Sequence, residues 1–209
     1  MERIVIDAAS EILVGDGLAA EGPILPERDG RSSVAVLAQP ATSDLATAIA
    51  ARCGEQGVSA HVRILPDGEA GKHPDVAVET YAWLNACGLH RGDTVVAVGG
   101  GARTDAAGFI AATYLRGRGA VYVPPTLLGA GDAAIGGKTA LNVGGKNLVG
   151  VFRHPARVLI DTAVLAGLPR PLLQEGAAEA VKAGLIGDPA LVVLFEDHGL
   201  DAPLDEVVY

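Results

Sequence analysis

Short runs of apolar and β-branched residues alternate with longer stretches of helical periodicity as far as Ile160. The short runs predict strands over Arg3–Ile6, Ile12–Val14, Ser33–Leu37, Ala60–Leu65, Thr94–Val98, Ala120–Val123 and Arg157–Ile160. The helical stretches between them predict helices over Asp44–Glu55, Asp75–Cys87 and Asp105–Leu115. Two of the predicted strands, Ser33–Leu37 and Thr94–Val98, are almost continuously apolar, as is typical of strands buried on both faces. The alternation predicts an α/β fold with a Rossmann-like, mainly parallel sheet flanked by helices.

The pattern changes after Asp161. Helical spacing without an intervening strand continues over Arg170–Leu185 and Pro189–His198. We therefore expect an α/β domain at residues 1–168, followed by the first helices of an α-helical domain at residues 169–209. The acidic and apolar stretch before Tyr209 is typical of the start of another element, so we expect this second domain to be incomplete, as in a truncated chain.

Composition limits the class of partner. Hydrophobic residues make up 49% and charged residues 20% of the 209 residues, as in ordinary globular proteins. A net charge of −9 argues against a nucleic-acid or anionic-membrane partner, because both need a broad positive surface. No apolar run reaches the roughly 18–20 residues of a membrane helix. Cys53 and Cys87 do not make a disulfide framework, so we expect a reducing cytoplasm.

The lysines lie in or beside segments that contain glycine. Four of the sixteen basic residues are lysines, namely Lys72, Lys138, Lys146 and Lys182. One interpretation of this placement is chance, because four residues are a small sample. The functional interpretation is that a compact ammonium group is needed at each position as a point charge for phosphate.

Two glycine-bearing segments each follow a predicted strand. Gly99–Asp105 opens a predicted helix, and glycines followed by a helix N-terminus let a backbone approach a phosphate closely. The structural alternative is a tight turn with Thr104 or Asp105 as N-cap. Leu65–Lys72 contains Pro-Asp-Gly, which favours a surface turn, although an acidic residue there can also hold ribose hydroxyls.

The segment Thr126–Asn147 combines two lysines, two asparagines and one aspartate with glycines. So many polar groups suit a phosphate and its counter-charge. The structural alternative is a glycine-rich hairpin with solvated polar tips.

The segment Gly176–Lys182 places Glu179 and Lys182 on one helix face. An exposed ion pair is the usual result of that spacing. Small apolar neighbours favour a partly desolvated pair instead, which makes Glu179 a candidate metal ligand and Lys182 a candidate acid, base or anion binder. Arg116 ends a predicted helix, where the helix dipole already accounts for a positive charge. The histidines show no metal-binding spacing.

The ordered motifs resemble the 3-dehydroquinate synthases of the sugar-phosphate cyclase superfamily, from about Leu65 to Ile186. They are L-P-D-G-E…K, G-G-G-x-x-T-D-x-A-G-F, Y-L-R-G, D-A-A-I-G-G-K-T-A-L-N, G-K-N-L-V-G and G-A-A-E-A-V-K-A-G. The resemblance implies a lyase of the shikimate pathway of aromatic amino acid biosynthesis. Such an enzyme converts 3-deoxy-D-arabino-heptulosonate 7-phosphate to 3-dehydroquinate and phosphate, with transient oxidation by NAD and with zinc as Lewis acid.

The resemblance also implies roles for individual residues. The implied NAD contacts are Asp67, Gly68, Glu69, Lys72, Gly101, Thr104, Asp105, Thr126, Lys138 and Lys146. The implied catalytic residues are Arg116, Asp132, Lys138, Asn142 and Lys182. In this set Asp132, Lys138 and Asn142 form the floor where nicotinamide meets substrate, with Lys138 and Asn142 facing phosphate, and Lys182 binds substrate. Arg116 resembles an arginine that reaches the substrate phosphate of a neighbouring subunit, which implies a homodimer.

Glu179 resembles a zinc ligand, and the two histidines that complete the family's zinc site lie beyond residue 209. Catalytic zinc normally has three protein ligands, so we expect the 209-residue chain alone to have weak activity or none. Two alternatives stay open. One is a related cyclase of secondary metabolism that acts on another sugar phosphate, and the other is a non-catalytic NAD-binding remnant.

Overall fold

The computed structural model describes residues 1–7, 10–27, 30 and 32–208. In these residues a seven-stranded sheet has the order β1-β2-β9-β6-β5-β3-β4. Its strands are β1 (Glu2–Asp7), β2 (Ser10–Gly15), β3 (Ser33–Ala38), β4 (Ser59–Ile64), β5 (Thr94–Val98), β6 (Gly119–Val123) and β9 (Arg157–Asp161). Only β1 pairs antiparallel, with β2, and every other pairing in this sheet is parallel. The predicted strands and the mainly parallel sheet are confirmed.

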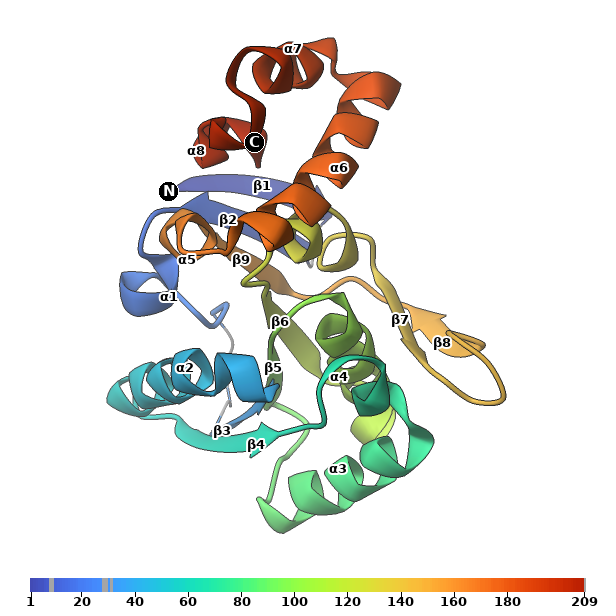
Figure 1. Cartoon of the computed structure of the whole chain (residues 1–209). Helices are drawn as coiled ribbons and strands as arrows, with labels where there is room; N and C mark the ends of the chain where they lie inside the picture. The colour runs from blue at the N-terminus through green and yellow to red at the C-terminus, as the bar shows by residue number, and fades with distance from the viewer. Residues whose placement is uncertain (8–9, 28–29, 31, 209) are drawn as a thin grey trace.

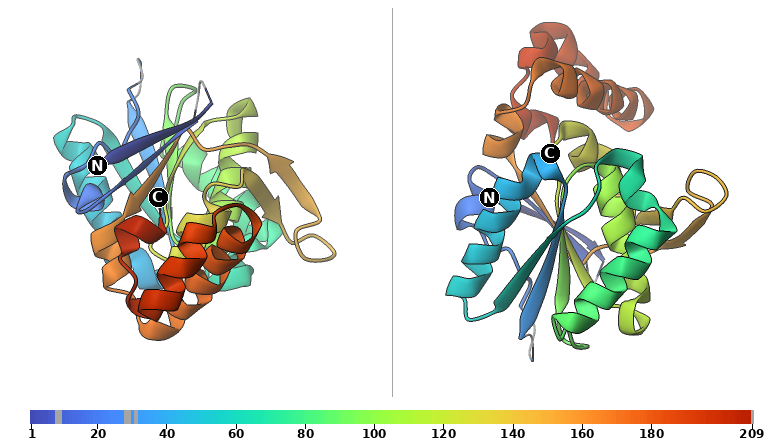
Figure 2. Two further views of the ribbon diagram at one scale, coloured as in Figure 1. Left: turned by 90° about the horizontal axis from the view of Figure 1, so that it is seen from above. Right: turned by 60° about the horizontal axis from the view of Figure 1, so that its bottom comes forward.

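Helices cover both faces of the sheet (Figures 1 and 2). They are α1 (Leu18–Glu21), α2 (Ser43–Glu55), α3 (Pro74–Ala86), α4 (Gly101–Thr113) and α5 (Thr162–Ala166). Alternate residues of β3 enter different cores: Val34 and Val36 pack with Ile49 of α2, while Leu37 packs in the cluster that contains Ala106 of α4. These two apolar cores hold the carboxyl ends of the strands in fixed positions, and the candidate site lies there.

Helix α4 begins earlier than its sequence pattern predicts. The helix starts at Gly101, with Gly100 as its N-cap, so neither Thr104 nor Asp105 is the cap. Helix propensity is low at glycine, which is why the sequence pattern placed the start at Asp105. As a result, Thr104 and Asp105 lie within the first turns of the helix and not before it.

The glycine-rich segment after β6 forms a hairpin, the structural alternative that the sequence left open. A π-helical turn, η4 (Gly129–Ala133), precedes β7 (Lys138–Leu141), which pairs antiparallel with β8 (Val149–Phe152). Figure 1 shows this hairpin projecting from the body beside α4. Its two strands have four residues each and escaped the strand prediction, because no run of apolar alternation is long enough.

The last helices are α6 (Arg170–Gly187), α7 (Pro189–His198) and α8 (Leu204–Val207), close to the ranges predicted for α6 and α7. Short 3-10 turns occur at η1 (Pro40–Thr42), η2 (Gly68–Lys72), η3 (Tyr114–Arg116) and η5 (Gly199–Asp201). Val207 and Ala202 join the apolar cluster on the α4 face of the sheet. A domain boundary at residue 168 stays a prediction. In the described part of the chain, no helix combines the length and apolarity that crossing a bilayer requires.

Candidate functional site

The carboxyl ends of β3, β4 and β5 meet at the point where the strand order reverses. The chain adds β4 on one side of β3 and then β5 on the other. In open α/β sheets, such a switch point is where ligands bind. Three segments leave the sheet there: Gln39 after β3, the loop 65–72 after β4, and the turn 99–101 after β5. Two of the three are the glycine-bearing segments that the sequence singled out.

Lys72 is a deeply buried charge of this region, with 1% of its side chain exposed. Its Nζ donates to Asp105 Oδ2 of α4 at 2.6 Å and to the side-chain oxygen of Asn147, in the hairpin turn. Burial raises the pKa of Asp105, and the hydrogen bond and charge of Lys72 oppose that rise without cancelling it. One ammonium group therefore joins the loop after β4, helix α4 and the hairpin.

Glu69 forms a second junction between the same loop and the hairpin. Asn142 Nδ2 donates to Glu69 Oε2 at 2.7 Å, and Lys146 Nζ lies 3.3 Å from Glu69 Oε1. The hydrogen bond from Asn142 is the largest cause that lowers the pKa of Glu69, and Lys146 lowers it further. The Asn142 amide thus faces Glu69 in this structure, and Asn142 Oδ1 accepts from the backbone N–H of Asn147 at 3.0 Å.

A cavity of about 500 Å³ lies between α4, η4 and the hairpin. Asp105, Asp132 and Lys138 line it together, along with Asn147 and Phe152. Lys138 Nζ is 3.8 Å from Asp132 Oδ1, and both side chains are about half exposed or more. Three of the charged residues that the sequence grouped are therefore brought to one cavity, and the lysine is held only loosely.

Glu179 and Lys182 pair with each other on α6. Glu179 lines a second cavity, of about 630 Å³, whose wall includes Ala130 and Gly131 of η4. The turn η4 therefore contributes to both cavities, through Asp132 to the first and through Ala130 and Gly131 to the second. The hydrogen bond to Glu179 is the main cause that raises the pKa of Lys182, and the charge of Asp132 adds to it.

The exposure of this pair is asymmetric. The Glu179 side chain is 26% exposed and the Lys182 side chain 61%. The expectation of a desolvated pair is therefore wrong for the amine, because only the carboxylate is largely covered. An exposed lysine with one partner remains free to turn toward a ligand.

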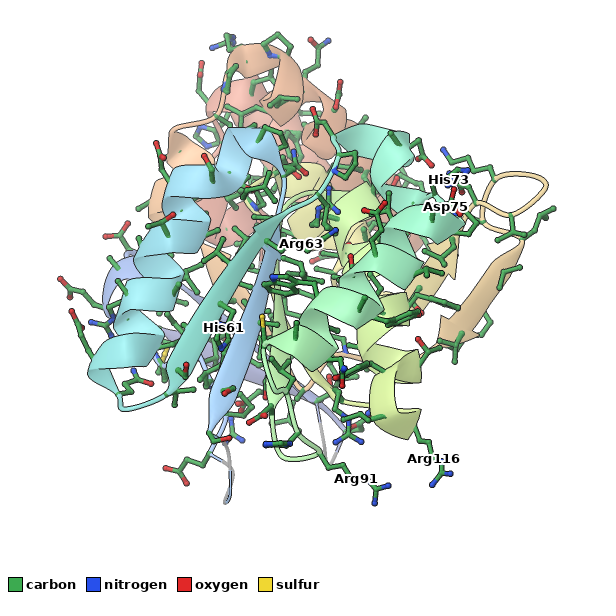
Figure 3. The ribbon with its side chains drawn as sticks, turned by 90° about the horizontal axis from the view of Figure 1, so that it is seen from below. His61, Arg63, His73, Asp75, Arg91 and Arg116 are labelled. Carbon is green, nitrogen blue, oxygen red and sulfur yellow. The ribbon has the colours of Figure 1, made fainter. Side chains whose placement is uncertain are left out.

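Arg116 lies away from both cavities. It follows α4 at the end opposite Gly101, and a helix of 13 residues is about 20 Å long. Figure 3 shows its side chain pointing outward at the lower edge of that view, well apart from the labelled His73 and Asp75. Both Leu115 (φ 47°) and Arg116 (φ 68°) have left-handed backbone conformations, which are uncommon for residues other than glycine.

The remaining predicted contacts shape the turns. Asp67 Oδ1 accepts from Gly68 N at 2.9 Å and caps η2, and Gly68 has φ 53°. Thr104 is fully buried, and its hydroxyl donates to Gly101 O at 3.0 Å within α4. The Thr126 hydroxyl accepts from the backbone N–H of Gly129, the first residue of η4, at 3.1 Å. In this structure the two hydroxyls stabilise local backbone geometry beside the glycine turn.

Sequence reasoning missed two residues of this region. Asn147 accepts from Lys72 and has φ 59°, a conformation that asparagine tolerates better than most residues. Arg103 lies in the first turn of α4 and is 1% exposed. A single arginine beside a triple glycine gives no sequence signal that separates a buried from a solvated side chain.

The described residues do not form a complete metal site. Within those ranges, no group of three or more His, Cys, Asp or Glu side chains is placed to hold a metal ion. Glu179 supplies one carboxylate, whereas catalytic zinc normally has three protein ligands. On their own, the described residues do not fit a catalytic zinc ion.

Comparison with known proteins decides the family. The model of the 3-dehydroquinate synthase N-terminal family matches residues 62–175, which is more than half of the chain. The chain belongs to the 3-dehydroquinate synthase N-terminal family. A 3-dehydroquinate synthase from Mycolicibacterium gilvum is 46% identical over 201 residues, covering 93% of this chain and 55% of that protein. The chain spans about half the length of the curated relatives it matches.

Solved structures of related cyclases have the same fold. A 2-epi-5-epi-valiolone synthase from Streptomyces hygroscopicus, with NAD⁺ and Zn²⁺ bound, matches with a TM-score of 0.82 and 29% identity over 98% of this chain and 61% of that one. A 2-deoxy-scyllo-inosose synthase complexed with carbaglucose-6-phosphate, NAD⁺ and Co²⁺ matches with a TM-score of 0.78 and 27% identity over 87% of this chain and 50% of that one. The Rossmann-like fold class is thereby confirmed.

Proposed function

We propose that this chain is the NAD-binding part of a 3-dehydroquinate synthase. The whole protein would convert 3-deoxy-D-arabino-heptulosonate 7-phosphate to 3-dehydroquinate and phosphate. The observation that carries the proposal is the convergence of Lys72, Asp105, Asp132 and Lys138 beside the switch point, in a chain 46% identical to curated synthases. NAD bound there supplies a hydride acceptor that is regenerated within the reaction.

The glycine turn at 99–101 suits the diphosphate of the dinucleotide. Gly101 starts α4, so its helix N-terminus offers N–H groups to an anion. Asp67 and Glu69, in the loop beside the turn, have carboxylates placed to accept from ribose hydroxyls. Lys72 is the last residue of that loop, and its buried side chain pairs with Asp105, so its proposed role is to shape the cofactor site.

Lys138 is the proposed anchor for the substrate phosphate. Its side chain is 69% exposed and its ion pair with Asp132 is long, so little is lost when the ammonium turns to a phosphoester. Asn142 would have to leave Glu69 to face the same group. Lys182, on α6, would hold another substrate oxygen. The proposal assigns Glu179 one ligand position of a zinc site and derives no reaction step through that metal.

The position of Arg116 supports a homodimer. An arginine at the far end of α4 cannot reach the cavity of its own chain, so the proposed contact with a substrate phosphate would require the cavity of a second copy. We also propose the division at residue 168 and a cytoplasmic location. A related cyclase acting on another sugar phosphate is the second candidate, favoured by the likeness to the valiolone synthase, although at lower identity than the 3-dehydroquinate synthases.

The substrate test uses a protein of the relatives' full length. Incubation with the heptulosonate phosphate should release phosphate and 3-dehydroquinate, identified by chromatography. Turnover of a different sugar phosphate alone would favour the related cyclase. NAD binding without turnover of either would favour the non-catalytic remnant.

The site test uses Lys138→Ala. We expect this variant to weaken binding of the substrate phosphate more than binding of NAD, both measured by calorimetry. Arg170→Ala is the matched control, since Arg170 is an exposed cation paired with Asp201 on a helix outside the first cavity. Equal loss of both ligands in Lys138→Ala would contradict the proposed role.

A further inference from the structure

Arg103 is a buried cation that the proposed function has not used. Its side chain is 1% exposed and is among the largest fully buried side chains of the described residues. Nη2 donates to Pro66 O at 2.7 Å. Nε and Nη1 are buried and, within the part of the chain that the structure describes, have no hydrogen-bond partner. Buried polar groups are nearly always paired, so two free donors on one guanidinium require an explanation.

The surrounding backbone makes room for this guanidinium. A Cβ on Gly71 would lie 2.9 Å from Arg103 Nη2, and a Cβ on Gly99 would lie 2.7 Å from Arg103 Cβ. Gly99 also lies against Gln39, at the end of β3. The charge is therefore placed directly under the switch point, between the loop after β4 and the turn after β5. At Gly71 the guanidinium lies against backbone that carries no side chain, and at Gly99 the stem of the Arg103 side chain does the same.

The charge is poorly compensated. Burial lowers the pKa of Arg103 to about 10, and the charge of Asp67 acts in the opposite direction. The Asp67 carboxylate accepts from Gly68 N and so is used as the cap of η2. A buried, partly unpaired cation destabilises a fold unless a partner arrives. The position at the N-terminus of α4 is where an anion is expected.

We propose that Arg103 is an anion-binding residue of the turn 99–101 and takes the diphosphate of a dinucleotide. This inference rests on the proposed function. Arg103 adds a full positive charge to the partial charge of the α4 N-terminus, and its unpaired Nε and Nη1 would donate to the phosphate oxygens. Without ligand, the unpaired guanidinium lowers the stability of the fold, and an anion restores it.

The test compares four forms of the 209-residue chain: the unchanged protein, Arg103→Met, Arg103→Lys and Arg118→Met. Arg118 is the matched control, because it is also a buried arginine but donates to the backbone oxygens of Arg91, Leu115 and Tyr114. The melting temperature is measured without ligand, and calorimetry gives the affinity for pyrophosphate, ADP and NAD. Adenosine is the uncharged comparison.

We expect Arg103→Met to melt no lower than the unchanged protein and to bind pyrophosphate, ADP and NAD roughly tenfold more weakly, with adenosine unaffected. Arg103→Lys should recover part of the affinity. Arg118→Met should melt lower and bind as before. Unchanged affinities in Arg103→Met, or an equal loss for adenosine, would overturn the inference while leaving NAD binding intact. If the unchanged protein binds none of the three anions, the proposed function fails as well.

Discussion

Replacing Lys72 by methionine tests whether the buried ammonium joins the loop, α4 and the hairpin. Methionine has a similar length and no charge, so the packing is largely kept. The substitution leaves Asp105 Oδ2 and the Asn147 side-chain oxygen without their donor. Removing one partner of a buried ion pair costs about 3–5 kcal/mol. Because Asp105 retains 20% exposure, we expect the lower limit, about 3 kcal/mol, or a fall in Tm of roughly 6–12 °C for this size.

The cost should depend on pH in a defined direction. Burial raises the pKa of Asp105 above its ordinary value of 3.8. A carboxyl whose folded pKa is raised contributes stability that is fully present below the unfolded pKa and is lost as pH rises through the folded pKa. Without Lys72 the folded pKa rises further. The destabilisation by Lys72→Met should therefore be smaller near about pH 5 and larger near about pH 8.

Urea unfolding of the single and double variants measures the pair. In an Asp105→Asn background, Lys72→Met should cost less than in the unchanged protein, because the charge that needed Lys72 is gone. Lys146→Met is the control, since its partner Glu69 and its own side chain are at least half exposed. The account of Lys72 as a buried junction would be refuted if both lysine substitutions lowered the free energy of unfolding equally. It would also be refuted if the loss in Lys72→Met did not change with pH.

Three further outcomes test packing, capping and acid sensitivity. Gly108→Ala should destabilise by about 1–3 kcal/mol in thermal unfolding, because its Cβ would lie 2.1 Å from the Tyr122 hydroxyl, whereas Gly54→Ala in α2 meets nothing and should stabilise by about 0.4–1 kcal/mol. Asp161→Ala should cost about 2–3 kcal/mol by urea unfolding, since the buried carboxylate accepts from three backbone N–H groups. Burial raises the pKa of Asp93, but the hydrogen bonds that its carboxylate accepts lower that pKa overall, below its ordinary value of 3.8. The carboxylate therefore contributes stability above the ordinary pKa, and this stability is lost as pH falls through the folded pKa. Asp93→Ala should flatten the acid limb of a stability–pH curve.

The sequence predicted the sheet well because its signal is local. Ser33–Ala38 and Thr94–Val98 are apolar on both faces since helices cover both, and this burial produces continuous apolar runs. The start of α4 was predicted wrongly, also for a local reason. Gly101 is a poor helix former, yet the backbone there is helical because α4 packs on the sheet below.

The site was only partly predictable, because its contacts connect segments far apart in sequence. Lys72 and Asn147 are 75 residues apart, and Glu69 and Asn142 are 73 apart. Glycine and lysine patterns indicate phosphate chemistry in each segment, but they carry no information on which carboxylate pairs with which ammonium. The pairing follows from strand order and from the hairpin folding back on α4. The same limit applies to Arg103, whose burial depends on Gly71 and Gly99 together.

Glu69 connects the proposed cofactor loop to the segment that joins the two hairpin strands. Its Oε2 accepts from Asn142 and its Oε1 faces Lys146, both in the segment that joins the hairpin strands. An ionised carboxylate has about four lone-pair sites, so about two remain for ribose hydroxyls. The carboxylate can therefore hold a cofactor and the hairpin at the same time. A dinucleotide held by Glu69 would therefore act on Asn142, whose side-chain oxygen accepts from the backbone N–H of Asn147 in the lining of the cavity, until a phosphoester draws the Asn142 amide away from Glu69.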